Sequence, residues 1–381
     1  MDARLKPIPV IDGHIHFDLP AQLPDLDAWR EAFQIAKLNF VCTHHPTRIS
    51  RVPEALFLKA HYPSTVYVFG GLDMSSLFSD PENCGQHFAD YLDVLAAMGC
   101  DGVKMIEGKP TTRKRLPIPP FDSPAYEPYW VKMEATATPL VFHVNDPEEF
   151  WDDDLVPDWA VEQGWSYGDR TYINNETQYA EVRNVMERHP NLSVIFAHFF
   201  FLSAQLERLG GYLDRYPNMH VDLTPGVEMY HNFAKQPEKV REFFVRYQDR
   251  IVFGTDLDES ALFVSGEDEL HRNDSDVRIH LIRLFLETEG AFAPESSAAL
   301  LGEFEKPFQG IHLPQEVLEK IYHKNFEKLA GRQPRALQRK AIAAECQRLL
   351  AYVETTREEN AHYDEDTAVL SRIYNYFAAV S

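Results

Sequence analysis

Val10-Ile11-Asp12-Gly13-His14-Ile15-His16 is the stretch of sequence on which the prediction of the fold depends. A short apolar run ends there in two histidines one residue apart. Side chains alternate between the two faces of a β-strand, so His14 and His16 point to one side and Ile15 to the other. With 16 histidines in 381 residues, chance alone gives on the order of 0.7 such pairs per chain. A metal site is therefore predicted only if later strands end in matching residues.

Short apolar runs alternate with longer amphipathic stretches along the whole chain. This alternation is typical of βαβ units and a parallel sheet. The apolar runs are 8–14, 39–43, 65–70, 102–106, 139–143, 192–198, 219–223 and 250–254, and the helical stretches include 26–37, 85–98, 126–137, 176–189, 204–216 and 239–247. Eight strands with intervening helices predict an α/β fold, a (β/α)8 TIM barrel.

Two connections are longer than usual, and a helical extension follows the barrel. The first connection, 145–175, contains three tryptophans and is predicted to lie above the barrel mouth, where it could act as a lid. The second, 257–313, contains a helix at 277–287 and precedes the last barrel helix, 314–330, which Gly331 ends. We therefore divide the chain into a barrel, 1–331, and a C-terminal extension, 332–381, of two amphipathic helices that pack on the barrel flank or at a subunit interface.

Charge and composition exclude several classes of protein. The formal net charge of −22 and the pI near 5.1 disfavour binding to nucleic acid or anionic membranes, since lysine and arginine are scattered among acids. The four cysteines lie far apart with no Cys-x-x-Cys spacing, which indicates reduced thiols. No apolar run reaches the length of about 18 residues that a membrane span needs, and the N-terminus lacks the apolar region of a signal peptide. We expect a cytoplasmic protein.

Three further polar residues follow predicted strands. The fifth run ends in His143, the sixth in His198, and the eighth is followed by Gly254-Thr255-Asp256. All strands of a parallel barrel end on one face, so these residues are expected to meet His14 and His16 there. Each alone is more often an ordinary polar residue, but five at matching positions favour a site.

Imidazole and carboxylate are the ligands that suit a divalent cation such as Zn²⁺. An incomplete protein shell leaves a coordination position for water, whose pKa the cation lowers to about 7. Asp256 could then be both a ligand and the base that accepts the proton of that water. His198 could bind the metal or polarise a substrate oxygen.

The motif Ile11-Asp12-Gly13-His14-Ile15-His16, together with His143, His198 and Gly254-Thr255-Asp256, resembles the amidohydrolase superfamily. It is similar in particular to amidohydrolase family 2, the TIM-barrel metal-dependent hydrolases and non-oxidative decarboxylases, over about residues 8–330. The resemblance implies a divalent metal, commonly zinc with manganese as the alternative, bound by His14, His16, His143 and Asp256. His198 would be a ligand or a catalytic histidine.

Lys104, at the end of the fourth run, leaves the number of metal ions open. Binuclear members of the superfamily carry a carboxylated lysine there that bridges two metals. Lys104 could instead be a substrate-binding ammonium or a member of a structural ion pair. We expect one metal ion, and two if Lys104 is carboxylated.

Other polar residues are candidates for substrate contacts. Arg48 could clamp a carboxylate, and Glu228 is a candidate at the same rim. A basic loop of Lys109, Arg113, Lys114 and Arg115 would favour an anionic substrate if it lies at the mouth, and would otherwise be solvated. One of the acids near the seventh strand, such as Asp222, could orient a ligand histidine.

These features predict a metal-dependent hydrolase that acts on an ester, lactone or amide of a small, carboxylate-bearing substrate. The alternative is a metal-dependent non-oxidative decarboxylase on the same scaffold. A third hypothesis is a non-catalytic ligand-binding barrel that assembles as a homo-oligomer through its C-terminal helices.

Overall fold

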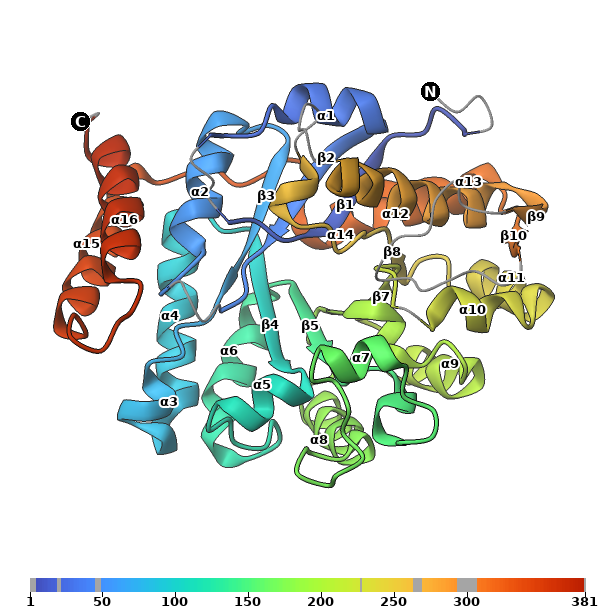
Figure 1. Ribbon diagram of the computed structural model, residues 1–381, viewed down its shortest axis with the longest axis horizontal. Coiled ribbons are helices and arrows are strands. Elements are labelled where there is room, and N and C mark those ends of the chain that lie inside the picture. The colour runs from blue at the N-terminus through green and yellow to red at the C-terminus, as the bar shows by residue number, and fades with distance from the viewer. Residues whose placement is uncertain are drawn as a thin grey trace.

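Eight parallel strands form a nearly closed barrel in the computed structural model, which describes residues 5–18, 22–44, 49–226, 228–262, 269–292 and 307–379. Each strand pairs with the next in sequence (Figure 1). The strands are β1 Val10–Ile15, β2 Ile35–Val41, β3 Val66–Gly71, β4 Gly102–Gly108, β5 Leu140–Val144, β6 Val194–Phe196, β7 Met219–Asp222 and β8 Ile251–Val252. The predicted TIM barrel is confirmed.

Helices alternate with the strands and surround the barrel (Figure 1). They are α1 Leu26–Phe33, α2 Val52–His61, α3 Ser76–Ser79, α4 Cys84–Met98, α5 Pro110–Arg115, α6 Glu127–Thr136, α7 Asp158–Glu162, α8 Asn175–Arg188, α9 Leu206–Arg215, α10 Met229–Ala234, α11 Pro237–Arg246, α12 Glu269–Glu287, α13 Gln315–Glu319, α14 Asn325–Ala330, α15 Arg339–Thr355 and α16 Tyr363–Ala378. No helix of the described ranges is both long and apolar enough to cross a membrane.

The seam between β8 and β1 is closed by a few backbone hydrogen bonds. Gly13 N–H donates to Phe253 O at 2.9 Å, and His16 N–H donates to Leu257 O at 2.7 Å. A Cβ on Gly13 would lie only 3.0 Å from Phe253 O, so a residue with a side chain would push the two strands apart. Glycine at this position therefore lets the barrel close directly beneath the two histidines.

The barrel interior is filled from below by a helix near the end of the barrel sequence. Inward side chains of the strands form a cluster of Ile11, Val41, Tyr67, Phe69, Val141, Ile195 and Val252 around Phe326 of α14. The Phe326 ring lies 5.1 Å from that of Tyr67 and 5.9 Å from that of Phe69. This packed interior leaves only the opposite end, where the strands terminate, for a site.

Some predicted boundaries were wrong. The helix predicted at 26–37 ends at Phe33, because Gln34 is left-handed with φ 57°, and β2 already begins at Ile35. The helix predicted at 277–287 begins earlier, as α12. The helix predicted at 314–330 is α13 and α14 joined by a π-helical turn at Lys320–Lys324.

Two elements outside the barrel complete the fold. β9 Glu289–Phe292 and β10 Phe308–Ile311 form an antiparallel pair that was not predicted. The C-terminal helices α15 and α16 pack on each other, and both contact α2, while α15 also contacts α4 (Figure 1). Their apolar faces therefore lie against the barrel flank.

Candidate active site

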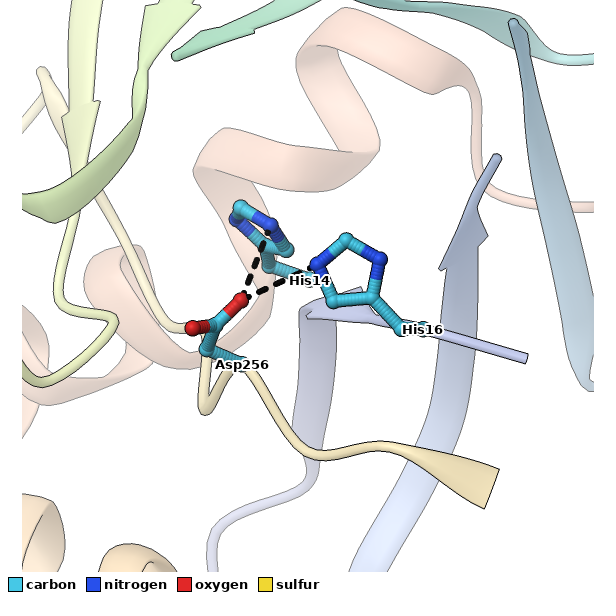
Figure 2. A group of neighbouring side chains, drawn as sticks. All are labelled: His14, His16 and Asp256. Carbon is cyan, nitrogen blue, oxygen red and sulfur yellow. Dashed lines mark hydrogen bonds and ion pairs between the residues drawn. The ribbon is translucent and has the colours of Figure 1, made fainter. Parts of the chain in front are cut away.

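His14, His16 and Asp256 meet where β1 and the segment after β8 reach the barrel mouth (Figure 2). Each offers one ligand atom, and these atoms all lie within 4.8 Å of one another. Asp256 Oδ1 is 3.1 Å from His16 Nε2 and 3.4 Å from His14 Nε2. These three residues, which come from the first and the last part of the barrel sequence, were predicted to meet and are brought together. We call His14, His16 and Asp256 the triad.

Asp12 holds the two halves of the triad in place. One of its oxygens accepts hydrogen bonds from the backbone N–H groups of His14 and Thr255, and the other accepts the Thr255 hydroxyl at 2.6 Å. Burial raises the pKa of Asp12 to about 7, although these hydrogen bonds act to lower it. Asp256 is itself left-handed, with φ 59°, and donates its N–H to His14 O at 2.8 Å.

Asp222, at the end of β7, orients the His14 ring. Its Oδ2 lies 2.8 Å from His14 Nδ1, and its Oδ1 accepts the backbone N–H of His198 at 2.8 Å. A carboxylate only accepts, so Nδ1 of His14 carries the proton and Nε2 keeps a lone pair. Asp222 is thus the acid that holds a predicted ligand histidine.

His198 lies in a turn of unusual conformation. The four consecutive residues His198, Phe199, Phe200 and Phe201 have φ values of 55°, 55°, 57° and 51°. Left-handed conformations of residues other than glycine cost free energy and cluster at functional sites. The rings of Phe201 and His198 stack at 5.0 Å, which contributes to holding the turn.

The tautomer of His198 follows from its neighbours. The Thr224 hydroxyl donates its single proton to Asp222 Oδ1, so the Thr224 oxygen must accept from His198 Nδ1, 3.2 Å away. Nε2 of His198 is then left as an acceptor. Burial lowers the pKa of His198 to about 3, so the ring is neutral near pH 7.

His143 lies near His198 but outside the triad. The two rings are 4.9 Å apart, and His143 Nε2 is 3.3 Å from Asp146 Oδ1. Neither His143 nor His198 belongs to the group of converging ligand atoms found among the described residues. Their part in binding a metal stays a prediction.

The triad fits a divalent metal ion by its donor chemistry. Burial lowers the pKa of His14 and of His143, with Lys104 adding to the effect at His14, so both rings keep a lone pair near pH 7. Nδ1 of His16 is buried without a hydrogen-bond partner in the described part of the chain. Neutral imidazoles beside an ionised carboxylate are the donors that zinc and manganese take in proteins.

Lys104 lies directly beside the triad. Its side chain is buried, and Nζ is 3.0 Å from His14 Nε2. Burial lowers the pKa of Lys104 to about 8, although Asp256 and Asp222 act against this. Among the described residues no carboxylate forms an ion pair with it, so a structural ion pair does not explain its burial.

A cavity of about 240 Å³ adjoins the triad. It is lined by His16, Lys104, Ile106, Lys109, His143, Asp146, Pro147, Phe150, Trp159, Trp165, His198, Phe201, Pro225, Gly226, Asp256 and Arg278. Three of these residues are lysine or arginine and two are aspartate, which makes the described wall net positive in a chain of charge −22. Such a wall favours an anionic ligand.

The other predicted substrate residues have mixed outcomes. Arg48 lies outside the described residues. Glu228 precedes α10 and is not among the described residues that line the cavity, so its role stays a prediction. Of the basic loop only Lys109 lines the cavity, because Arg113 pairs with Glu181 at 2.9 Å and Arg115 is exposed.

Two residues at the cavity were not predicted. Arg278 of α12 donates to the backbone oxygens of Thr255 and Asp256 at 3.1 and 3.2 Å. It lies in a long connection with no motif, so no pattern in the sequence pointed to it. Asp146 lies three residues after His143, and that spacing is a weak signal that could have drawn attention to it.

Comparisons with known proteins give one family and several solved folds. The sequence model of a family described as amidohydrolase matches residues 85–332. A TIM-barrel protein from Bordetella bronchiseptica aligns at 13% identity with a TM-score of 0.51, over 85% of this chain and 99% of that chain. A Staphylococcus aureus protein assigned to the amidohydrolases aligns at 14% identity with a TM-score of 0.51, over 85% and 100%. At such identities the likeness shows the fold alone. No curated protein matches the sequence significantly.

Proposed function

The chain belongs to the amidohydrolase family, and on this premise we propose that it is a metal-dependent hydrolase that cleaves an ester, lactone or amide bond of a small anionic substrate. The observation that carries the proposal is the triad of His14, His16 and Asp256 beside a cavity with a net positive wall. Active sites of TIM barrels lie at this end of the strands.

A divalent metal ion, Zn²⁺ or alternatively Mn²⁺, would be held by the triad, with His143 and His198 as further candidates. Such an ion, when bound, polarises a substrate oxygen and lowers the pKa of water to about 7. The tautomer of His198 supports a role as ligand over a role as proton donor, because its Nε2 carries no proton. We expect one ion, and a second only if Lys104 is carboxylated.

The protein groups around the triad have separable tasks. Asp256 would offer an oxygen to the metal and would accept the proton of the attacking water, as a general base. Lys104 lies beside His14 and Arg278 beside Asp256, both line the cavity, and both would hold a substrate carboxylate against the cavity wall. Phe150, Trp159 and Trp165 line the cavity and would exclude bulk water from the reacting atoms.

Non-oxidative decarboxylation is the second candidate function. The observation that favours it is the set of cations beside the triad, since the reaction needs a carboxylate at the metal position. A panel of aromatic and dienoic acids and of their esters and lactones separates the two reactions. We expect the esters and lactones to be cleaved to acids and no bicarbonate to be released. Bicarbonate release from the free acids would instead show that the protein is a decarboxylase and not a hydrolase.

The metal-to-protein ratio is the direct test of the proposal. After reconstitution with Zn²⁺ or Mn²⁺ and removal of excess metal, we expect about one ion per chain. Full turnover by a metal-free sample would refute the mechanism, and so would a protein that retains no metal. Metal binding with tight ligand binding but no turnover would favour the non-catalytic barrel.

Replacing Asp222 by asparagine is expected to weaken Zn²⁺ binding by roughly 10- to 100-fold. The two oxygens of Asp222 accept from His14 Nδ1 and from the His198 N–H. Asparagine has one oxygen and one NH₂ group, so its NH₂ group would face one of these two N–H donors. Isothermal titration calorimetry measures the change. Asp249→Asn, at an exposed ion pair with Lys320, is the matched control and should bind Zn²⁺ as the wild type does. Equal affinities of the two variants would show that Asp222 does not position His14.

A cytoplasmic location is part of the proposal. All four cysteines are buried and free. Free thiols persist in the reducing cytosol.

A further inference from the structure

The Asp146 carboxylate connects the 145–175 segment to the barrel mouth. Its Oδ1 accepts from Lys109 Nζ at 2.9 Å and lies 3.3 Å from His143 Nε2. Its Oδ2 accepts the Tyr167 hydroxyl at 2.6 Å. Asp146 is 3% exposed. One buried carboxylate thus contacts the end of β5, the loop after β4 and the middle of the segment that covers the cavity.

The backbone before Asp146 is fixed by its own set of contacts. Asn145 is left-handed, with φ 72°, a conformation that asparagine tolerates better than most residues. Its N–H donates to Gly108 O at 2.9 Å, and its side-chain oxygen accepts from Gln178 Nε2 at 2.7 Å. These bonds turn the chain at the end of β5, so they hold the backbone at Asp146 independently of the rest of the 145–175 segment.

The 145–175 segment has an apolar cluster of its own. Phe150, Ala160 and Tyr167 are buried among Trp151, Val156, Trp159, Trp165 and Tyr172, apart from the main barrel core. Polar and cation–π contacts at its edges join it to the barrel, among them Lys109 over the Trp165 ring at 4.4 Å. The same cluster supplies three aromatic walls of the cavity beside the triad, Phe150, Trp159 and Trp165.

Asp146 also determines which nitrogen of His143 carries the proton. Lys109 Nζ donates to Oδ1 of Asp146, and the Tyr167 hydroxyl donates to Oδ2. Both oxygens of Asp146 therefore act as hydrogen-bond acceptors, and His143 Nε2 bears the proton. Nδ1 of His143 keeps the lone pair that a metal or a substrate proton would use. In metal sites, a carboxylate that accepts from the nitrogen of a histidine that does not bind the metal fixes the orientation of the ring and raises its basicity.

We propose that Asp146 is a positioning residue that couples closure of the 145–175 segment over the cavity to the orientation of His143. The proposal rests on the proposed function, in which His143 belongs to the metal site. With the segment closed, Tyr167 and Lys109 hold the carboxylate where it accepts the His143 N–H. When the segment lifts, Tyr167 leaves with it and the carboxylate is free to turn away from His143.

Tryptophan fluorescence and Zn²⁺ affinity, measured on the full chain, test the two halves of the coupling. Three of the five tryptophans lie in the segment, and the other two, Trp29 and Trp130, are buried in the barrel. Quenching by acrylamide therefore reports on the segment. Tyr167→Phe removes one hydroxyl and Asp146→Asn removes the charge. Asp169→Asn is the control, since Asp169 is exposed and, among the residues that the structure describes, accepts only from Thr171 in the same segment.

Tyr167→Phe is expected to raise the open fraction on the order of 10-fold, because a hydrogen bond to a charged group is lost. Its Zn²⁺ affinity should fall less than that of Asp146→Asn. Asp146→Asn should increase quenching as well and weaken Zn²⁺ binding by roughly 10- to 100-fold. Asp169→Asn should match the wild type in both measurements.

A change in only one property of Asp146→Asn would overturn the coupling, and so would wild-type behaviour of both variants. If Asp146→Asn does not fold, Tyr167→Phe alone decides, because wild-type quenching in that variant contradicts the proposal. A wild-type protein that binds no Zn²⁺ would instead refute the proposed function and its metal site. Quenching would then still show whether Asp146 holds the segment, so the two failures can be told apart.

Discussion

Asp256→Asn protein is expected to bind metal poorly and to turn over about 10²- to 10⁴-fold more slowly, even with excess metal, since the proposed function makes Asp256 both a charged ligand and the general base. Although burial raises the pKa of Asp256, the hydrogen bond with His16 and the nearby imidazoles hold it well below its ordinary range. The wild-type site thus presents a full negative charge to a cation. An amide presents none.

The Asp256→Asn fold should remain intact. Residue 256 has φ 59°, which asparagine adopts readily, and its N–H bond to His14 O is made by the backbone. Asp214→Asn, at an exposed ion pair with Arg246, is the matched control and should keep full metal content and turnover. Metal analysis, circular dichroism and rates on one substrate measure the three quantities. Wild-type metal content in Asp256→Asn would contradict the proposed ligand set.

Lys59→Met is expected to lower the free energy of unfolding by about 3–5 kcal/mol, because it leaves a buried carboxylate without its cation. Lys59 of α2 is 0% exposed and donates to Asp101 Oδ2 at 2.6 Å and to Gly99 O at 2.8 Å. Asp101 also accepts the backbone N–H groups of Val68 and Arg335. The pair therefore joins α2, β3, the start of β4 and the C-terminal extension.

Urea denaturation of three variants tests this expectation. Lys320→Met breaks an exposed pair with Asp249 and should cost less than about 1 kcal/mol. Lys59→Met combined with Asp101→Asn should recover part of the loss, since no unpaired charge remains while an acceptor for Val68 and Arg335 is kept. A Lys59→Met protein as stable as Lys320→Met would show that the pair contributes little.

The fold was predictable because barrel strands are buried on both sides. Each strand is a continuous apolar run, and eight of them separated by amphipathic stretches leave few alternatives. Details that depend on tertiary contacts were not predictable. Ile11 faces the barrel interior and His14 faces its mouth, which strict alternation forbids. A register shift between Asp12 and Ile15 in the pairing of β1 with β2 makes this possible.

In the candidate site, too, the residues at strand ends were predictable, and those that depend on tertiary contacts were not. His14, His16 and Asp256 follow from residue type and position at strand ends, because parallel strands end on one face. Asp222 was found only as one of several acids near the seventh strand. Asp146 and Arg278 were not predicted, because their contacts are with residues distant in sequence. Asp146 contacts Tyr167 and Lys109. Arg278 contacts Thr255 and Asp256.

The triad straddles the barrel seam, and His16 and Asp256 are 240 residues apart in the chain. On the proposed function, no ribosome-bound fragment that stops before Asp256 could bind the ion through the triad during synthesis, so metal capture would be a late event in maturation. Ion binding would then favour the finished protein over partly folded chains, by about 2.7 kcal/mol when free metal is at 100 times its dissociation constant. Cellular metal supply would thereby influence how much of this protein accumulates, apart from how fast it works.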